Sequence, residues 1–454
     1  MPKPADIPAC PEAPSVQSPA RVVREYDISL VTPLFGGGAE AGIPDESLPI
    51  RGTSIRGQLR YWWRIVIGHQ LGSRMWQREE EVFGSTDFPS PLRVHVAEQP
   101  RILPVDPGEY GSAGDPAAYA LFSAIESGRQ VAREGPVFRL QLAWDDAQGL
   151  QSRRRGQNAQ RKKEHRAVLP EVVQDIGLDI IEALRAWCTF GGLGARSRRG
   201  CGAVFCQELA SALPHLPGSI YLAPPQSNAV AAWKESVKAY RNFRQSPRGK
   251  KHQKVIGPKT VRVPGRSHWP EADSIRKITG SSLKPPPGTP SNATPADENS
   301  QDHSVPVVPE HLLPAFPRAI LGLPINFHFA DSPGKTRPGR PYKDPQDVQL
   351  TPVLPDGVGG SDRMLAPAIT RPLWHQGKWH PAVVIIKPSI PSGLKLKLIG
   401  ERARADGGDL SYDLPIDRVV NSSFGVLRPM RSYASALSAL ADFLKETGFT
   451  EVVP

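Results

Sequence analysis

Hydrophobic and polar positions in the first half of the chain alternate as in strands over four short segments and follow helical spacing over two longer ones. The first strand, REYDISLVTPLF at 24–35, is interrupted by Pro33, and a glycine loop follows it. The helix SIRGQLRYWWRIVIGHQL comes next, and Thr53 or Ser54 can cap it. The remaining predicted elements are strands 90–98 and 136–144, a helix at 170–190, and a strand at 202–209. This order is that of a ferredoxin-like fold, an antiparallel sheet with both helices on one face.

The second half shows a weaker pattern of the same kind. Helical spacing predicts helices at 229–245 and 432–448, and alternation predicts strands at 320–330, 380–389, 393–401 and in the closing FTEVV. We therefore expect an α+β chain of two ferredoxin-like domains. The first covers 23–215, and the second covers 216–454 and contains insertions.

Two proline-rich segments and one basic segment interrupt this organisation. Proline accounts for 49 of the 454 residues, about twice its average share. It is concentrated in the tail 1–22 and in the polar stretch 282–310, which cannot bury enough apolar surface to fold and are expected to be disordered. The segment 152–167, with RRRGQNAQRKKEHR at its centre, is expected to be a mobile basic loop, although an RNA backbone could order it.

The charge balance narrows the class of partner. A formal net charge of +11 favours a polyanion, either nucleic acid or an anionic membrane surface. The longest apolar run is AVVII at 382–386, too short for a membrane span, and the proline-rich start shows no secretory signal. The four cysteines form no CxxC pair, so we expect no structural zinc, no disulfide framework and a cytoplasmic location. We also expect no nucleotide cofactor, because Gly36-x-Gly38-x-x-Ala41 does not open directly into a helix and no GK[ST] motif follows a glycine loop.

The helix after the first glycine loop carries separate apolar and cationic stripes. A helical wheel places Ile55, Leu59, Trp62 and Val66 on the core face. A second stripe is cationic, and none of its members has an acid three or four positions away. It is either a solvated face or a ridge that follows a phosphate backbone. The candidate RNA-binding residues here are Arg51, Arg56, Arg60, Trp63 and Arg64, where Trp63 at the border of the stripes either packs or stacks on a base.

The segment GGLGARSRRGCG at 191–202 combines five glycines with three arginines. Glycines can expose backbone amides as an anion-binding nest, and arginines bind phosphate in bidentate geometry. Alternatively the segment is a tight connection whose glycines serve packing. In a ferredoxin-like fold the last strand lies beside the first, so this turn should lie near the first glycine loop. We favour an RNA-backbone contact by Gly191, Gly192, Gly194, Arg196, Arg198, Arg199 and Gly200.

A strand–helix–strand–strand–helix–strand unit that ends in GGLGARSRRGCG resembles the RAMP superfamily of CRISPR-associated RNA-binding proteins. TPLFGGG, IRGTSIRGQLRYWWR and EEEVFGS, with GRSHWPEADSIRKITG at 265–280 and FPRAILGLPI at 316–325, resemble the first-numbered RAMP subunit of type III-B Cmr effector complexes. The resemblance implies two ferredoxin-like RAMP domains without chemistry of their own. It also implies a place near the 3′ end of the CRISPR RNA, beside other RAMP subunits, where the subunit helps to capture target RNA. The basic segment, the proline-rich insertion and Cys201 depart from the family pattern.

A further basic region at 241–277 holds eleven Lys or Arg against two acids. It is either a mobile charged surface or part of an RNA site, with Arg262, Arg266 and Trp269 as candidates. Trp269 either stacks on a base or anchors the segment to the second domain.

Two other functions stay open on the sequence alone. Some RAMP relatives cleave CRISPR RNA with a histidine, without a metal ion, and His69, His252 and His268 are the histidines near basic residues. None belongs to a recognisable catalytic motif, and no HExxH or cluster of metal ligands is present, so we expect no enzyme activity. The third possibility is a scaffold that binds only protein.

Overall fold

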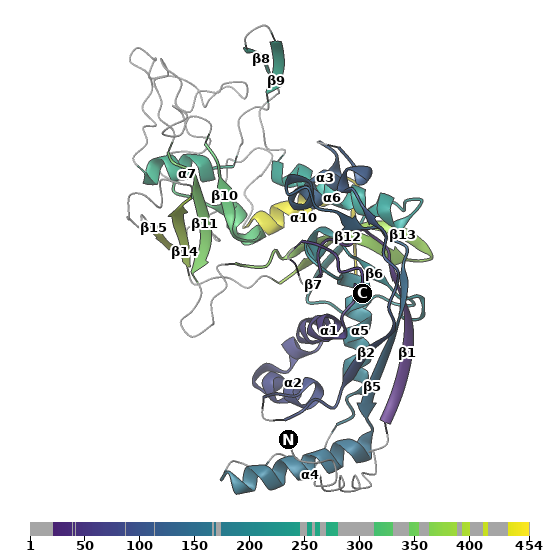
Figure 1. Cartoon of the computed structure of the whole chain (residues 1–454). Coiled ribbons are helices and arrows are strands. Elements are labelled where there is room, and N and C mark those ends of the chain that lie inside the picture. The colour runs from purple at the N-terminus through teal and green to yellow at the C-terminus, as the bar shows by residue number, and fades with distance from the viewer. Residues whose placement is uncertain are drawn as a thin grey trace, which may run out of the picture. The chain divides into compact units, whose positions relative to one another are not determined.

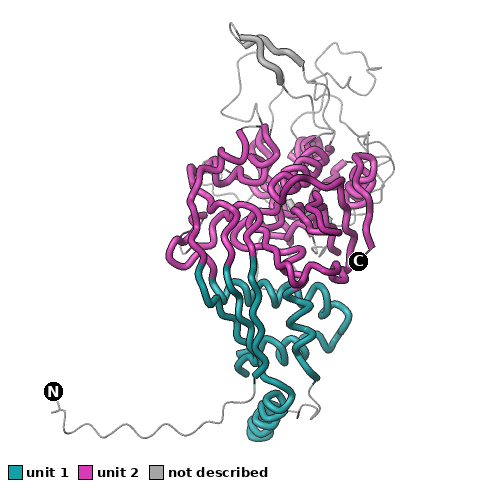
Figure 2. The backbone as a smooth tube through the Cα atoms, turned by 90° about the vertical axis from the view of Figure 1, so that its right-hand side faces the viewer, with its two compact units in different colours: residues 1–28, 51–99, 138–184 teal, residues 29–50, 100–137, 185–454 magenta. Residues whose placement is uncertain are grey.

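The computed structural model describes residues 21–38, 40, 42–86, 88–112, 114–165, 168, 174–245, 252–256, 259–263, 269–279, 313–329, 345–353, 363–387, 393–399, 412–415 and 435–453. Segment 282–310 and almost all of the tail 1–22 lie outside these ranges. The chain divides into two compact units (Figure 2). One comprises 1–28, 51–99 and 138–184, and the other comprises 29–50, 100–137 and 185–454.

The first sheet has the strand order of a ferredoxin-like fold (Figure 1). Its strands are β1 (Arg21–Leu30), β2 (Arg93–Glu98), β5 (Val137–Asp145) and β6 (Val204–Phe205), in the order β2-β5-β1-β6. The last strand is antiparallel to the first, with Ser29 opposite Phe205. The predicted fold class is thereby confirmed, although β6 is much shorter than the predicted strand 202–209 and a 3-10 turn follows it.

Three helices of this half were predicted in part. α1 (Gly52–Val66) buries Ile55, Leu59, Trp62 and Val66, which confirms its predicted core face. It is capped by the backbone of Arg51, so neither Thr53 nor Ser54 is its cap, as we had expected. Two 3-10 turns lead from α1 to α2 (Met75–Phe83). α5 (Gly177–Phe190) begins seven residues after the proline that was predicted to open it.

The connection between β2 and β5 is not the plain loop that we expected. It contains the short strands β3 (Pro104–Val105) and β4 (Val131–Ala132), and the helix α3 (Pro116–Glu126) between them. Asp115 caps α3 by accepting a hydrogen bond from the Ala117 amide, and Pro116 provides a favourable first turn. The alanine-rich face of α3 packs in one core cluster with Trp233 and Cys201.

The basic segment that we predicted to be a mobile loop is a helix, α4 (Ala147–Lys163). Asp146 caps it by accepting from the Gly149 amide at 2.8 Å. Its arginines reach acids outside the segment: Arg153 pairs with Asp145, and Arg154 pairs with Glu81, each at 2.6 Å. These ion pairs dock the helix and remove part of the repulsion that argued against it.

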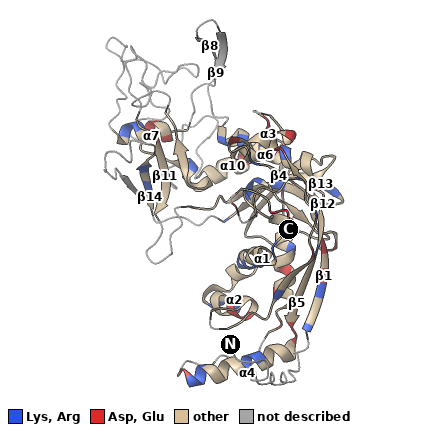
Figure 3. Cartoon of the chain, viewed as in Figure 1, with Lys and Arg blue, Asp and Glu red and all other residues tan. Residues whose placement is uncertain are grey.

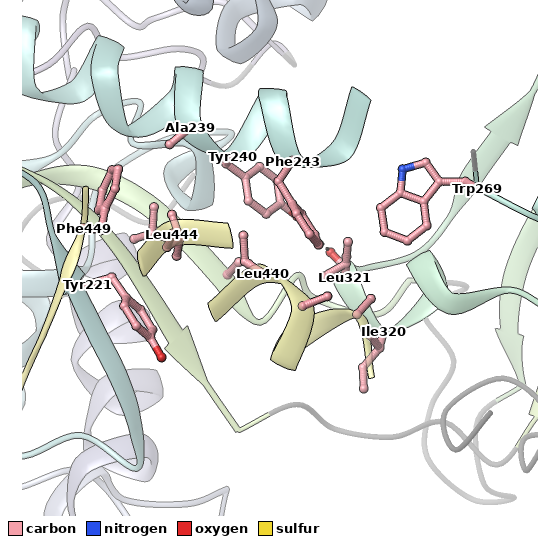
Figure 4. Close-up of a cluster of buried hydrophobic side chains, with 14 of the residues drawn as sticks. Tyr221, Ala239, Tyr240, Phe243, Trp269, Ile320, Leu321, Leu440, Leu444 and Phe449 are labelled. Carbon is pink, nitrogen blue, oxygen red and sulfur yellow. Dashed lines mark hydrogen bonds between the residues drawn. The ribbon is translucent and has the colours of Figure 1, made fainter. Parts of the chain in front are cut away.

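The second half repeats the ferredoxin-like strand order. β7 (Gly218–Leu222), β12 (Ala368–His375), β13 (Lys378–Ile386) and β16 (Thr450–Val452) form a sheet in the order β12-β13-β7-β16. α6 (Ala229–Gln245) follows the first of these strands and α10 (Ala436–Glu446) precedes the last. Tyr240 and Phe243 of α6 pack with Leu440 and Leu444 of α10 in a buried cluster (Figure 4).

Two insertions in this second module build a third sheet. β10 (Ile325–Phe327) and β11 (Val348–Val353) precede β12, whereas β14 (Gly393–Leu398) and β15 (Tyr412–Pro415) follow β13, and the order is β10-β11-β14-β15. α7 (Glu271–Ile278) packs on it through Ile275. The hairpin of β8 (His252–Ile256) and β9 (Lys259–Val263) also belongs to the first insertion. The predicted strand at 320–330 is a strand over only three residues.

Candidate nucleic-acid interface

The two glycine segments of the sequence lie side by side in the second unit. The Ala195 amide donates to the Phe35 carbonyl at 2.7 Å, and the two residues form a β-bridge. A Cβ placed on Gly37 would come within 3.8 Å of the Gly194 Cα. The predicted proximity of the turn at 191–202 to the first glycine loop is therefore confirmed.

Most glycines of the turn are required by close backbone packing. A Cβ on Gly202 would lie 2.1 Å from the Leu193 carbonyl oxygen, and one on Gly200 would lie 2.6 Å from the Thr370 carbonyl oxygen. Both residues also have positive φ, +65° and +75°, which disfavours any side chain. Gly191 and Gly192 are buried, whereas Gly194 and Ala195 are exposed. Packing thus explains the buried glycines, the alternative that we had favoured less.

The turn is not a row of bare amides, as we had expected. The amides of Leu193, Arg199, Gly200 and Gly202 each donate to a backbone carbonyl, as does that of Ala195. An anion nest needs several amides directed at the ligand. With these amides already bonded, the binding capacity of the turn lies in its side chains.

The arginines of the turn are held by neutral groups. Arg196, at φ +58°, donates to the Ser123 hydroxyl at 2.6 Å and places its guanidinium 4.5 Å from the centre of the Phe122 ring. Arg199 lies 4.4 Å from the centre of the Tyr240 ring and donates to the Ala368 carbonyl. Arg198 donates to the carbonyl of Ala366. Within the described part of the chain, neither Arg196 nor Arg199 forms an ion pair with an acid, so the positive charge of both is retained.

Burial lowers the pKa of Arg196, since desolvation disfavours a charged group. An arginine starts so far above neutrality that a lowered pKa still leaves it protonated. The neutral partners therefore fix its orientation without cancelling its charge.

A buried arginine from the second module fixes the start of the turn. Arg371 on β12 donates to the carbonyls of Gly191 at 2.7 Å, Cys188 at 3.0 Å and Val204 at 3.1 Å. Cys188 and Gly191 lie at the C-terminal end of α5, where helix carbonyls lack partners within the helix and a cation is favourable. Burial lowers the pKa of Arg371 to about 9, which still leaves the guanidinium charged at neutral pH. Sequence reasoning missed this residue because its partners lie more than 160 residues away.

The cationic stripe of α1, in the first unit, is partly neutralised by one acid. Glu79 of α2 accepts from Arg64 at 2.6 and 2.8 Å, and also from Arg60. Burial raises the pKa of Glu79, but hydrogen bonds from Arg64 and Arg60 outweigh this effect and hold the pKa below its usual value. Arg56 donates to the Leu92 carbonyl at 3.0 Å and to that of Phe83. Arg51 is half-buried at the N-terminus of the helix.

Two predicted base-stacking residues are core residues instead. The Trp63 side chain is fully buried, and its indole N–H donates to Asp179 at 2.7 Å. Trp269 is 2% exposed, donates to the Arg244 carbonyl at 3.0 Å and packs edge-on against Phe243. The stacking roles that we gave them are wrong, and the alternative of an anchor is correct for Trp269. Trp76 and Phe122, which are exposed for 64% and 49%, are aromatics that we did not single out.

Other predicted residues are placed only in part. Arg262 lies on β9, of which only the backbone is described, and Arg266 and His268 lie outside the described residues. On α4 the side chains of Arg155, Lys162 and Lys163 are exposed, and Figure 3 shows Lys and Arg along this helix.

Metal and membrane sites were searched over the described residues only. No group of three or more His, Cys, Asp or Glu side chains in those residues could hold a metal ion. In the same residues, every helix is too short or too polar to cross a bilayer.

Solved structures of Cmr proteins are similar to the chain at low identity. The crystal structure of Cmr1 from Pyrococcus furiosus in its apo form superposes on 95% of this chain and 98% of that chain, with a TM-score of 0.42 and 14% identity. The cryo-EM structure of the type III-B Cmr-beta bound to cognate target RNA covers 41% of this chain and 55% of that chain, with a TM-score of 0.26 and 14% identity. At these values the fold assignment rests on the strand orders and not on the superpositions.

Sequence comparison identifies the first domain. A stretch of 64 residues is 36% identical to the Pyrococcus furiosus protein described as CRISPR system Cmr subunit Cmr1-2, and covers 13% of this chain and 32% of that relative. The match thus spans about a third of the length of the relative. The family model described as the RAMP superfamily matches residues 27–204. This match confirms the resemblance drawn from the turn and the order of elements: residues 27–204 form a domain of the RAMP superfamily.

Proposed function

We propose that this chain is a non-catalytic RNA-binding subunit of a type III-B Cmr effector complex. In this proposal it lies near the 3′ end of the CRISPR RNA, beside other RAMP subunits in the cytoplasm, and helps to capture target RNA in antiviral defence. The RAMP match and the partial similarity to a Cmr1-2 subunit support the family context.

The observation that carries the RNA-binding role is the retained charge of Arg196 and Arg199 beside a surface without large side chains. Gly37, Gly194 and Ala195 are exposed next to these arginines, so a ribose-phosphate strand could approach the backbone closely. Guanidinium groups that no acid neutralises bind phosphate oxygens and release counterions. No histidine or acid is needed for this role, which supports a function without catalysis.

The test is the salt dependence of RNA binding by the full-length chain. Fluorescence anisotropy of a labelled single-stranded RNA is measured at several salt concentrations for wild type and for R196A/R199A. Each phosphate contact adds about 0.7 to the slope of log affinity against log salt. We expect the double variant to bind more weakly and to lose up to about 1.4 from that slope.

A matched control removes the same charge elsewhere. Arg133 and Arg139 are exposed and paired with Glu109 and Asp27, so R133A/R139A should change affinity and slope much less. Equal effects of the two double variants would show that net charge alone matters, and would remove the turn from the site.

The α1 stripe and the catalytic alternative are tested with the same RNA. Because Glu79 already compensates two of its arginines, we expect R56E/R60E/R64E to weaken binding in proportion to the charge that remains exposed. Labelled CRISPR RNA should stay intact with the isolated chain. Cleavage that H69A, H252A or H268A abolishes would contradict the non-catalytic assignment.

A further inference from the structure

The Trp76 side chain on α2 is exposed for 64% of its surface in the first unit. Large aromatic side chains are usually well buried, and an exposed one beside a charged group indicates a binding surface. The guanidinium of Arg64 on α1 lies 5.2 Å from the centre of the Trp76 ring, within the range of a cation–π interaction.

The arginine beside this ring is held in place. Two hydrogen bonds from Arg64 to Glu79, at 2.6 and 2.8 Å, fix the plane of its guanidinium. A group that is already ordered loses less entropy when a ligand binds. Ring and guanidinium therefore form a preorganised flat surface.

The charge that this surface presents to solvent is positive. The side chains of Arg60 and Arg64 keep 44% and 40% of their surface exposed, whereas their shared partner Glu79 keeps 1%. Glu80, one turn after Trp76, is held by Ser85 at 2.8 Å and by Arg161 at 4.0 Å. A nearby ligand thus meets two cations and an aromatic face, with the closest acid buried beneath them.

We propose that Trp76 and Arg64 form a platform on which one base of a single-stranded RNA stacks, while Arg60 contacts its phosphate. Every base has a flat aromatic face, so such a platform binds RNA without reading its sequence. The inference rests on the proposed RNA-binding function and assigns to Trp76 the stacking role that the buried Trp63 cannot have. The polyanion is favoured over a protein partner because both exposed charges have the same sign.

The experiment compares full-length wild type with W76A, W76F and L178A. The probes are a labelled oligouridylate of about 20 nucleotides, long enough for one binding site, and an abasic ribose-phosphate strand of the same length. Leu178 is the control because it is 74% exposed in the same unit and its replacement also removes exposed apolar surface.

We expect W76A to bind the oligouridylate about 5- to 150-fold more weakly, the range for loss of one stacked base. W76F should keep most of the affinity and L178A all of it. The abasic strand should bind wild type and W76A equally, because it has no base to stack. Quenching of tryptophan fluorescence by the oligouridylate should be smaller in W76F than in wild type.

Three results would overturn the proposal. If wild type binds the oligouridylate and W76A binds it equally well, the platform is wrong and the RNA-binding function stands. If W76A weakens both probes equally, Trp76 supports the fold and not a base. If wild type binds neither probe, the proposed function fails and the platform fails with it.

Discussion

Single residues of the turn at 191–202 have different physical roles although their types repeat. Gly202 is buried against a carbonyl at positive φ, whereas Gly194 is exposed. Arg199 lies against a tyrosine ring, and Arg196 lies against a phenylalanine ring and a hydroxyl. The composition of the segment suggested a site, but the partners that separate these roles come from α3, α6 and β12.

We expect G202A to be strongly destabilising. Its Cβ would meet the Leu193 carbonyl oxygen at 2.1 Å, and the left-handed conformation alone costs roughly 1–2 kcal/mol for a residue with a Cβ. The free energy of unfolding should fall by at least about 2 kcal/mol in urea titrations.

Gly57 provides the control for this change. It lies inside α1, and a Cβ there would meet nothing within 4 Å. G57A should therefore stabilise the protein by about 0.5–1 kcal/mol, the usual gain inside an exposed helix. If both variants lowered stability equally, close packing would not be the reason for glycine at 202.

The tryptophans show where sequence reasoning at the residue scale ends. The helical wheel correctly placed Trp62 on the core face of α1 and left Trp63 at its border. The group that decides the case, Asp179, lies on α5 and accepts from the Trp63 indole. Periodicity along one helix contains no information about an acceptor 116 residues away.

At the scale of elements, α4 shows how ion pairs override local charge repulsion. The segment was predicted as a loop because its own sequence holds so many cations. The acids that order it, Asp145, Glu80 and Glu81, lie just before it or on α2. The aspartate cap was visible in the sequence and was the signal that could have identified the helix.

Adjacent arginines of α4 allow a matched test of this explanation. The Arg154 side chain is 3% exposed and pairs with Glu81, which is 17% exposed, whereas Arg155 is exposed. We expect R154M to lower the free energy of unfolding by about 2–4 kcal/mol, since removal of one partner leaves a largely buried carboxylate. R155M removes the same charge and should change it by less than about 0.5 kcal/mol.

Urea titrations followed by circular dichroism measure both variants. Equal and small effects would mean that the helix is held by its cap and apolar contacts. Equal and large effects would mean that the exposed face of α4 also contributes to folding.

At the scale of the whole molecule, the strand order appears twice. Strong alternation and helical spacing in the first half predicted the complete order of its main elements. In the second half, α6, β13, β14 and α10 were predicted, but the central strand β7 and its distant neighbour β12 were not. Insertions that build the third sheet separate these segments, so the repeat is visible only in the pairing of strands.

The second module closes its sheet with the end of the chain, and this leads to the last prediction. β16 pairs with β7 through Thr450 opposite Leu222 and Val452 opposite Ile220, and Phe449 just before it is 6% exposed in the core cluster. Truncation after Gly448 removes this strand and ring, and loss of a buried phenylalanine alone costs about 3–5 kcal/mol.

We therefore expect the chain truncated after Gly448 to lose a large part of a total stability of about 5–15 kcal/mol. Removal of only the final two residues is the control, because Val453 is 88% exposed and follows β16. The midpoint of urea unfolding should fall strongly in the longer truncation and stay unchanged in the shorter one. Equal midpoints in both would mean that β7 is stable as an edge strand, and that the second ferredoxin-like module does not need its fourth strand.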